Sequence, residues 1–339
     1  MKTVFVVDDN DVNLVKAKLS LDGHYRIFTL ASAEKMFSML DKITPDLILL
    51  DIKMPKTDGF AAIKQLKEHE QTANIPVIFL TAATDDVTEA QGFELGAVDF
   101  ISKPFSVPVL LNRIKLQLDI NEIIHERTEK LLRLQNSMVS VLAKMIENRD
   151  KLTGEHIGRT TGYIKILLNA MLEYNVYAGE IKDWDLEIVI SSARLHDIGK
   201  IAVTDVILNK PGSLTADEFE IMKTHANEGE KIIDSIIAES GDEIFLRNAK
   251  LFAGHHHERW DGTGYPHKLK GEEIPLQGRI MAIADVYDAL ISERPYKRAL
   301  PHNEAVEIIK KCSGTHFDPK IVDVFLKVNG LFEEVNLSR

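Results

Sequence analysis

Near its N-terminus the chain reads Leu47-Ile48-Leu49-Leu50-Asp51-Ile52-Lys53-Met54-Pro55, and this segment sets the architecture of the first 120 residues. Four apolar residues that end in an aspartate are typical of a strand buried on both faces of a parallel sheet. Similar short runs lie before and after it, at Thr3–Val7, Tyr25–Thr29, Val77–Leu80 and Phe100–Ile101. Helix-like segments separate the runs, so we predict an α/β doubly wound, five-stranded parallel sheet with its site beyond the carboxyl ends of the strands.

The ends of these expected strands carry charged and polar side chains. Asp8 and Asp9 follow the first run, Asp51 the third, Thr81 the fourth and Lys103 the fifth. Three carboxylates at neighbouring strand ends would repel one another unless a divalent cation joined them, and Mg2+ prefers such oxygen ligands. The lysine and the threonine could then complete a phosphate site.

Over residues 1 to about 120 this pattern resembles the receiver domain of two-component response regulators, which has a flavodoxin-like fold. The resemblance implies that Asp51 is the phosphoacceptor and that a cognate sensor histidine kinase is a partner. It also places a cis peptide at Lys103-Pro104. Its remaining implied site residues are Asp8 and Asp9, which with Asp51 hold Mg2+, Thr81 and Lys103 at the phosphoryl group, and Phe100 at the aromatic switch position.

A second set of reactive groups lies in the C-terminal half. His196-Asp197-Ile198-Gly199-Lys200 is followed by His225, by His255-His256-His257-Glu258 and by Asp285. Imidazole nitrogen and carboxylate oxygen suit first-row divalent metals, and a carboxylate directly after a histidine can bridge two ions. A purely structural metal site is disfavoured because such sites are Cys-rich, and Cys312 is the only cysteine. The pattern predicts a metal-dependent hydrolase with two ions roughly 3.5–4 Å apart.

The pairing of His196-Asp197 with Gly264-Tyr265-Pro266 resembles the HD-GYP family, a branch of the HD superfamily of metal-dependent phosphohydrolases. The match runs from about Glu147 to Phe325. The resemblance implies an all-α domain that hydrolyses cyclic di-GMP to pGpG by metal-activated hydroxide, and it leaves a second cleavage to GMP open. The metal ligands that it implies are His156, His196, Asp197, His225, His256, His257 and Asp285, with Asp197 bridging and acting in catalysis.

The resemblance assigns further groups around these ligands. It places Lys200 beside the hydroxide and both Arg294 and Lys297 at the substrate phosphates, with Tyr265 also in the substrate site. Leu152 stands where some family members carry a glutamate that helps to hold a third metal, so we expect two ions. Fe or Mn is favoured, and Zn, Ni or Co also suits His/Asp ligands.

Residues 109–145 are nearly free of glycine and proline and predict a long helix between the two domains. Apolar residues recur along it at alternating spacings of three and four, at Leu131, Leu134, Met138, Val141 and Met145. This spacing fits the seam of a homodimeric coiled coil or a helix packed on its own domain. The expected domains are a receiver over 1–120, a helical linker over 121–145 and the hydrolase over 146–339.

Global properties narrow the function further. The net charge of −11 argues against general nucleic-acid binding. No apolar run reaches the ~20 residues of a membrane span, and a single cysteine fits a reducing cytoplasm. The leading interpretation is a cyclic di-GMP phosphodiesterase controlled by phosphorylation at Asp51. A scaffold that binds partners or ligand without turnover, and a hydrolase for another cyclic dinucleotide or a nucleoside phosphate, are the alternatives.

Overall fold

The computed structural model describes residues 1–82, 86–149, 155–241, 243–293 and 298–337. The chain divides into two compact units, Met1–Leu132 and Arg133–Arg339. No helix among the described residues combines the length and the apolar character that crossing a bilayer would require.

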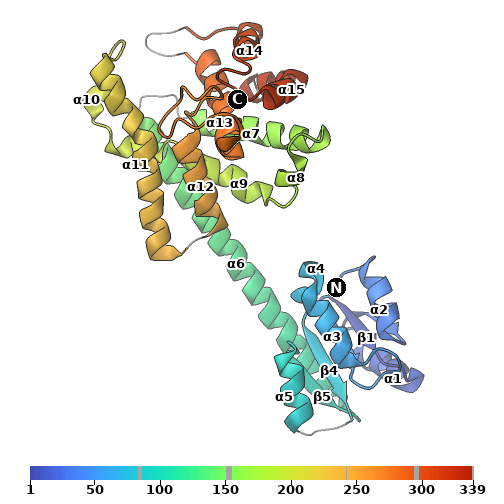
Figure 1. Ribbon diagram of the computed structural model, residues 1–339. Coiled ribbons are helices and arrows are strands. Elements are labelled where there is room, and N and C mark those ends of the chain that lie inside the picture. Colours follow the sequence, from blue (N-terminus) through green and yellow to red (C-terminus); the bar gives the residue numbers. More distant parts are fainter. Residues whose placement is uncertain (83–85, 150–154, 242, 294–297, 338–339) are drawn as a thin grey trace. The chain divides into compact units, whose positions relative to one another are not determined.

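The first unit is built on a five-stranded parallel sheet with the strand order β2-β1-β3-β4-β5 (Figure 1). The strands are β1 Thr3–Val7, β2 Arg26–Leu30, β3 Leu47–Asp51, β4 Val77–Thr81 and β5 Asp99–Ser102. The predicted doubly wound sheet is confirmed. The second strand begins one residue later than expected, because Arg26 and not Tyr25 pairs with Thr3 of β1.

Both faces of this sheet are covered by helices. Val4 and Val6 of β1 pack with α1 (Asp11–Leu21) and the start of α6 (Val107–Arg149). Phe5 and Val7 point the other way, toward α2 (Ala33–Leu40) and α3 (Gly59–Glu68). Two further helices, α4 Glu70–Ala73 and α5 Asp86–Glu94, complete the unit. Burial on both faces explains why the strands are continuous apolar runs and do not alternate with polar residues.

The strand order places the expected site at one point of the sheet. β1 pairs with β2 on one side and with β3 on the other, so the order reverses next to β1. Asp8 follows β1 and Asp51 ends β3. In open α/β sheets ligands bind at such a reversal, outside the carboxyl ends of the strands.

Helix α6 contributes to the core of each unit through different turns. Leu110, Ile114 and Leu118 are buried in the first unit, and Val139 and Ile146 are buried in the second. The predicted seam lies on another face, where its residues are all more than half exposed: Leu131 66%, Leu134 52%, Met138 59%, Val141 56% and Met145 62%. Packing of the seam on its own domain is therefore wrong, because Val139 and Ile146 make that contact.

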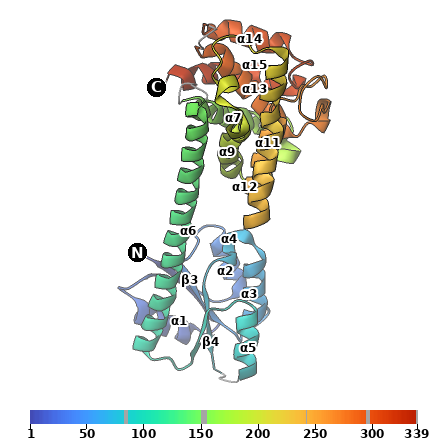
Figure 2. The same cartoon turned by 90° about the vertical axis from the view of Figure 1, so that its left-hand side faces the viewer.

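The second unit is helical, as predicted. Its α-helices are α7 His156–Glu173, α8 Ala178–Ile181, α9 Leu186–Ser192, α10 Asp205–Leu208, α11 Ala216–Ser240, α12 Ile244–His255, α13 Leu276–Ile291, α14 His302–Lys311 and α15 Pro319–Leu337. Short 3-10 helices are η1 Ala193–Leu195, η2 Ile198–Ala202 and η3 Gly271–Glu273. Helices α7, α13 and α15 share one core, in which Tyr163 stacks on Phe332. Helices α11 and α12 lie side by side (Figure 2).

Two local features of this unit shape the approach to its histidines. Helix α11 begins with a capping box, in which the Thr215 hydroxyl accepts from Glu218 N and the Glu218 carboxylate accepts from Thr215 N. Helix α9 does not continue as a regular α-helix, because the following turn is the 3-10 helix η1. The backbone N–H of His196 donates to the carbonyl of Ala193, three residues back, and this tighter turn leads directly into the histidine-aspartate motif.

Candidate metal centres

His196 and Asp197 lie at the junction between the 3-10 helices η1 and η2. Helix α11 approaches this junction so closely that a Cβ at Gly199 would lie 1.8 Å from the backbone oxygen of His225 and 2.4 Å from the nitrogen of Gly229. Only glycine leaves room for such a contact. The close approach of the two backbones brings Asp197 and His225 to the same place.

Three imidazoles at this junction share one hydrogen-bonding pattern. The Nδ1 atoms of His196, His225 and His256 lie 3.0, 2.7 and 2.9 Å from backbone carbonyl oxygens. A carbonyl only accepts, so each Nδ1 carries the hydrogen and each neutral ring keeps a lone pair on Nε2. The Nε2 atoms of His225 and His256 face each other at 3.3 Å. Two facing lone pairs repel, and a cation between them removes the repulsion.

The carboxylate of Asp197 spans two groups of imidazoles. Its Oδ1 lies 3.5 Å from Nε2 of His225 and 3.7 Å from Nε2 of His256. Its Oδ2 lies 3.3 Å from Nε2 of His196 and 2.8 Å from Nζ of Lys200. Burial by itself raises the pKa of Asp197, but the Lys200 ammonium beside it outweighs burial and holds that pKa well below its usual value. Asp197 is therefore an anion at neutral pH.

Two groups of possible metal ligands lie next to this carboxylate. His225, His256 and His257 form one group, with ligand atoms all within 4.8 Å of one another. His156, His196 and Asp285 form the other. Nε2 of His156 lies 3.4 Å from Nε2 of His196 and 3.6 Å from Oδ1 of Asp285. The two groups with a shared carboxylate fit the donor set of a binuclear centre.

The loop after His257 forms a wall beside this centre. Glu258 is buried and accepts hydrogen bonds from the backbone N–H groups of His267, Lys268 and Leu269, at 2.6, 3.1 and 3.1 Å. This anchoring holds the ring of Tyr265 with its centroid 4.8 Å from that of His257. Burial raises the pKa of Tyr265, so its hydroxyl keeps its proton and can donate to a ligand.

In the first unit the acidic side chains also converge. Oxygens of Asp8, Asp9 and Asp51 lie within 4.8 Å of one another and could hold a metal ion. Nζ of Lys103 lies 2.6 Å from Asp8 and 2.9 Å from Asp51, and the Lys103–Pro104 peptide is cis as the resemblance implies. Burial raises the pKa of Asp51, and Lys103 opposes that rise.

The other two predicted residues of this pocket lie on adjacent strands. Thr81 is buried at the carboxyl end of β4, which pairs with β3 on one side and β5 on the other. Phe100 of β5 is also buried, with its ring centroid 5.4 Å from that of Phe79 and 4.9 Å from that of Phe93. The aromatic ring therefore points into the domain core.

Comparison with known families agrees with these two sites. Residues 140–321 match the HD domain, and residues 4–115 match the response regulator receiver domain. This chain belongs to the HD domain family. Its receiver and its HD domain carry the two candidate sites described above, and the resemblances derived from the sequence are confirmed.

Three relatives of this HD domain protein illustrate the range of names in the family. This chain is 41% identical to a "Probable cyclic di-GMP phosphodiesterase" of Vibrio cholerae, over 96% of this chain and 77% of the relative. It is 33% identical to the "Cyclic di-GMP phosphodiesterase response regulator RpfG" of Xanthomonas campestris, over 86% of this chain and 77% of the relative. It is 34% identical to the "3'3'-cGAMP-specific phosphodiesterase 2" of Vibrio cholerae, over 66% of this chain and 38% of the relative.

Sequence reasoning missed a buried pair that holds His156 of the HD domain. Nδ1 of His156 donates to Asp288 at 2.8 Å, and Arg159 contacts both carboxylate oxygens of Asp288, at 2.6 and 2.9 Å. Burial lowers the pKa of His156, but Asp288 and Asp285 raise it overall. The only signals in the sequence were the position of Arg159 three residues after His156 and the position of Asp288 three residues after Asp285.

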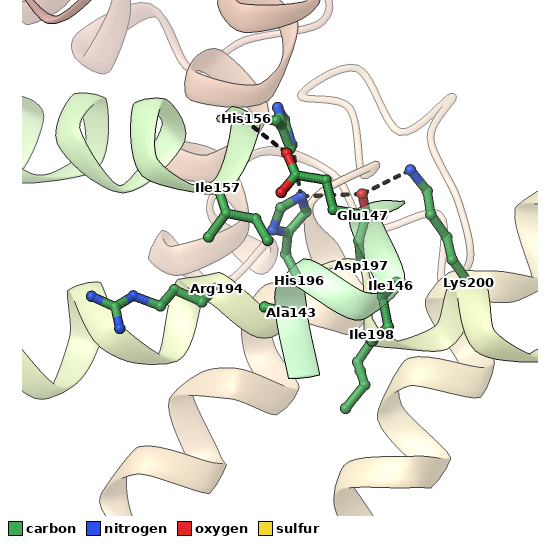
Figure 3. A pocket seen from close by; sticks show the side chains of 10 residues that line it. All are labelled: Ala143, Ile146, Glu147, His156, Ile157, Arg194, His196, Asp197, Ile198 and Lys200. Carbon is green, nitrogen blue, oxygen red and sulfur yellow. Dashed lines mark hydrogen bonds and ion pairs between the residues drawn. The ribbon is translucent and has the colours of Figure 1, made fainter. Parts of the chain in front are cut away.

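Sequence reasoning also gave no role to Glu147. This residue lines a pocket together with His156, His196, Asp197 and Lys200 (Figure 3). This residue is 5% exposed, and its Oε1 accepts from the backbone N–H of His156 at 2.8 Å. Its Oε2 has no hydrogen-bond partner in the described part of the chain. Figure 3 shows the carboxyl group extending toward His156 and His196. A buried carboxylate oxygen without a hydrogen-bond partner, beside two imidazoles, is a possible metal ligand, and a bound cation would supply the partner that it lacks.

Three predicted positions lie outside the described residues. Arg294 and Lys297 fall within residues 294–297, and Leu152 falls within residues 150–154. Of the HD domain residues predicted for the site, the structure brings together His156, His196, Asp197, Lys200, His225, His256, His257, Tyr265 and Asp285.

Proposed function

We propose that this protein is a phosphorylation-controlled phosphodiesterase that hydrolyses cyclic di-GMP to the linear dinucleotide pGpG. The observation that carries this proposal is the position of Asp197, with one oxygen near His225 and His256 and the other near His196. A carboxylate in this position can bridge two ions that together bind and activate a phosphodiester. Two relatives that match 96% and 86% of this chain are named as cyclic di-GMP phosphodiesterases, which supports the choice of substrate.

Two divalent ions are part of the proposal. When bound, they would offset charge on the phosphoryl oxygens and lower the pKa of a water molecule. Fe or Mn is favoured, and Zn, Ni or Co suits the same donors. The residues that would hold them are His156, His196, Asp197, His225, His256, His257 and Asp285.

Other side chains would bind and orient the substrate. Lys200 is held 2.8 Å from Asp197 and would supply positive charge beside the scissile phosphate. Tyr265 would donate its hydroxyl from the wall of the site. By resemblance, Arg294 and Lys297 would bind the two phosphates of the cyclic dinucleotide, because guanidinium and ammonium groups pair with phosphate oxygens.

The receiver would control this reaction through Asp51. A sensor histidine kinase would supply the phosphoryl group, with Mg2+ held by Asp8, Asp9 and Asp51 and the phosphoryl oxygens contacted by Thr81 and Lys103. A change at Phe100 would alter the surface of the receiver. Helix α6 is continuous from Val107 to Arg149, and its exposed seam from Leu131 to Met145 offers a dimer contact that phosphorylation could change.

A second substrate is favoured by one relative, the 3'3'-cGAMP-specific enzyme. That hybrid dinucleotide has the same two phosphates, so the metal centre alone does not distinguish it from cyclic di-GMP. The two substrates differ in one base, and competition between them would therefore reveal which base the site selects.

The decisive experiment is hydrolysis of cyclic di-GMP by anaerobically purified protein reconstituted with Fe or Mn. Products are resolved by chromatography, the metal is counted on the same sample, and the hybrid dinucleotide is offered in competition. We expect pGpG, with or without further cleavage to GMP, and about two metal ions per chain. A protein with two metals that binds the dinucleotide without cleaving it would overturn the enzymatic proposal in favour of a scaffold.

A further inference from the structure

His255 stands directly before His256 and His257 but takes no part in the centre described above. It is the last residue of α12 and is 8% exposed. Its Nδ1 donates to the carbonyl of Leu251 at 3.1 Å, which leaves the lone pair on Nε2. Within the described residues this Nε2 makes no hydrogen bond. A buried imidazole with an unused lone pair needs a partner.

Two further ligand-type side chains lie close to His255. Oε2 of Glu230, on α11, lies 2.8 Å from Nε2 of His267, which follows Tyr265-Pro266 in the loop. The rings of His255 and His267 lie 5.1 Å apart between centroids. One ligand atom from each of Glu230, His255 and His267 lies within 4.8 Å of the other two. Three separate elements therefore meet at one set of donors.

The backbone around these three residues makes room for them. A Cβ at Gly254 would lie 2.4 Å from Cδ and Oε1 of Glu230, so the carboxylate of Glu230 lies directly against the backbone of α12. A Cβ at Gly278 would lie 2.7 Å from Cβ of His255. The third ligand is placed by the loop anchor, because the N–H of His267 donates to Glu258 at 2.6 Å. This is a built cluster and not a chance meeting of surface side chains.

We propose that Glu230, His255 and His267 form a further metal site that binds a zinc ion. Two neutral imidazoles and one carboxylate, with a fourth position left to water, are a recurring ligand set for Zn2+. Metal–ligand bonds of about 2.0–2.1 Å at tetrahedral angles separate the ligand atoms by about 3.3 Å. In this structure the Glu230 and His267 ligand atoms lie 2.8 Å apart, and all three lie within 4.8 Å of one another. A Glu230–His267 pair alone would leave the lone pair of His255 without a partner among the described residues.

This site shares no ligand with the binuclear centre and does not depend on the proposed phosphodiesterase activity. Its ion would join α11, the end of α12 and the loop that carries Tyr265. Zinc would therefore stabilise the loop that forms the wall of the main site. Binding to the folded state alone raises its stability in proportion to the logarithm of the zinc concentration.

The test uses the full-length protein, freed of metal with a chelator and then titrated with Zn2+, or with Co2+ as a coloured substitute. His267→Gln removes a ligand but keeps a hydrogen-bond donor to Glu230. We expect this variant to bind about one ion fewer per chain than the wild type. It should also lose one component of the Co2+ ligand-field spectrum and part of the rise in Tm with zinc.

Two controls make the result decisive. His125→Gln alters an exposed histidine that lies 4.0 Å from Glu129 in a simple pair, and it should bind metal like the wild type. Glu230→Gln repeats the test from α11 in case the loop variant folds poorly. If both His267→Gln and Glu230→Gln bind as many ions as the wild type with the same Co2+ spectrum, Glu230 and His267 form only an ion pair. Turnover is not measured, so this outcome is separate from the fate of the proposed function.

Discussion

The receiver pocket and the HD domain centre differ in how far the chain itself balances their charges. In the receiver, Lys103 lies 2.6 Å from Asp8 and 2.9 Å from Asp51, so a cation of the chain faces two of the three carboxylates. In the HD domain, the Nε2 atoms of His225 and His256 face each other at 3.3 Å, and Lys200 contacts the carboxylate of Asp197. Because Lys103 already offsets part of the negative charge in the receiver pocket, we expect an ion to bind there weakly and reversibly. The facing imidazole lone pairs of the HD domain repel each other unless a cation lies between them, so we expect metal ions to bind there tightly.

The largest effect that this comparison predicts is that of Asp197→Ala. Removing the carboxylate between the two ligand groups should lower both the metal content and the rate of cyclic di-GMP hydrolysis, the rate by more than about 10³-fold. Metal analysis and product chromatography on one sample measure both effects. Asp183→Ala, at an exposed position, is the matched control. Wild-type turnover in the Asp197 variant would remove this residue from the centre.

A smaller loss is expected when the support of a ligand is changed instead of the ligand. Asp288→Asn keeps the shape of the side chain but weakens its contacts with His156 and Arg159. Changes to such supporting groups typically cost 10–100-fold in metal affinity or activity. Metal titration should show weaker binding, and turnover should recover at high metal concentration. A loss of turnover that excess metal does not restore would contradict this positioning role.

The same comparison shows what could be predicted from the sequence. The receiver site follows from local pattern, since each acidic residue directly follows an apolar strand whose place in the sheet is set by burial on both faces. Four of the HD ligands were predicted because they stand in the short motifs His196-Asp197 and His256-His257. Asp288 and Glu147 were missed because their contacts with His156 depend on helix packing: Asp288 lies 132 residues away, and Glu147 lies on the neighbouring helix. The 3-10 turn at Ala193 has no signal in apolar spacing either.

Phosphorylation should have an intermediate effect, because it acts on the HD domain at a distance. Wild-type protein treated with beryllofluoride should differ from Asp51→Asn in turnover or in oligomeric state, by about 5-fold, at the low end of measured couplings. Turnover assays and analytical ultracentrifugation on both samples test this. Met138→Glu, which places a charge in the exposed seam, should reduce any dimer that forms. Identical behaviour of the two Asp51 samples in both assays would contradict control through the receiver.

The smallest effect concerns stability in the absence of metal and follows from the sign of the pKa shift at Asp51. Burial raises this pKa above its ordinary value of 3.8, so the folded receiver holds the proton more tightly than the unfolded chain does. Ionisation of Asp51 therefore opposes folding at neutral pH, and the cost disappears below the unfolded pKa. Asp51→Asn should raise the free energy of unfolding at pH 7 in chelator, with a gain that shrinks toward pH 3.8. Asp41→Asn, at an exposed position, should show no such gain. A destabilised Asp51→Asn receiver would mean that Lys103 outweighs burial. The receiver pocket would then resemble the HD centre, where Lys200 outweighs the burial of Asp197.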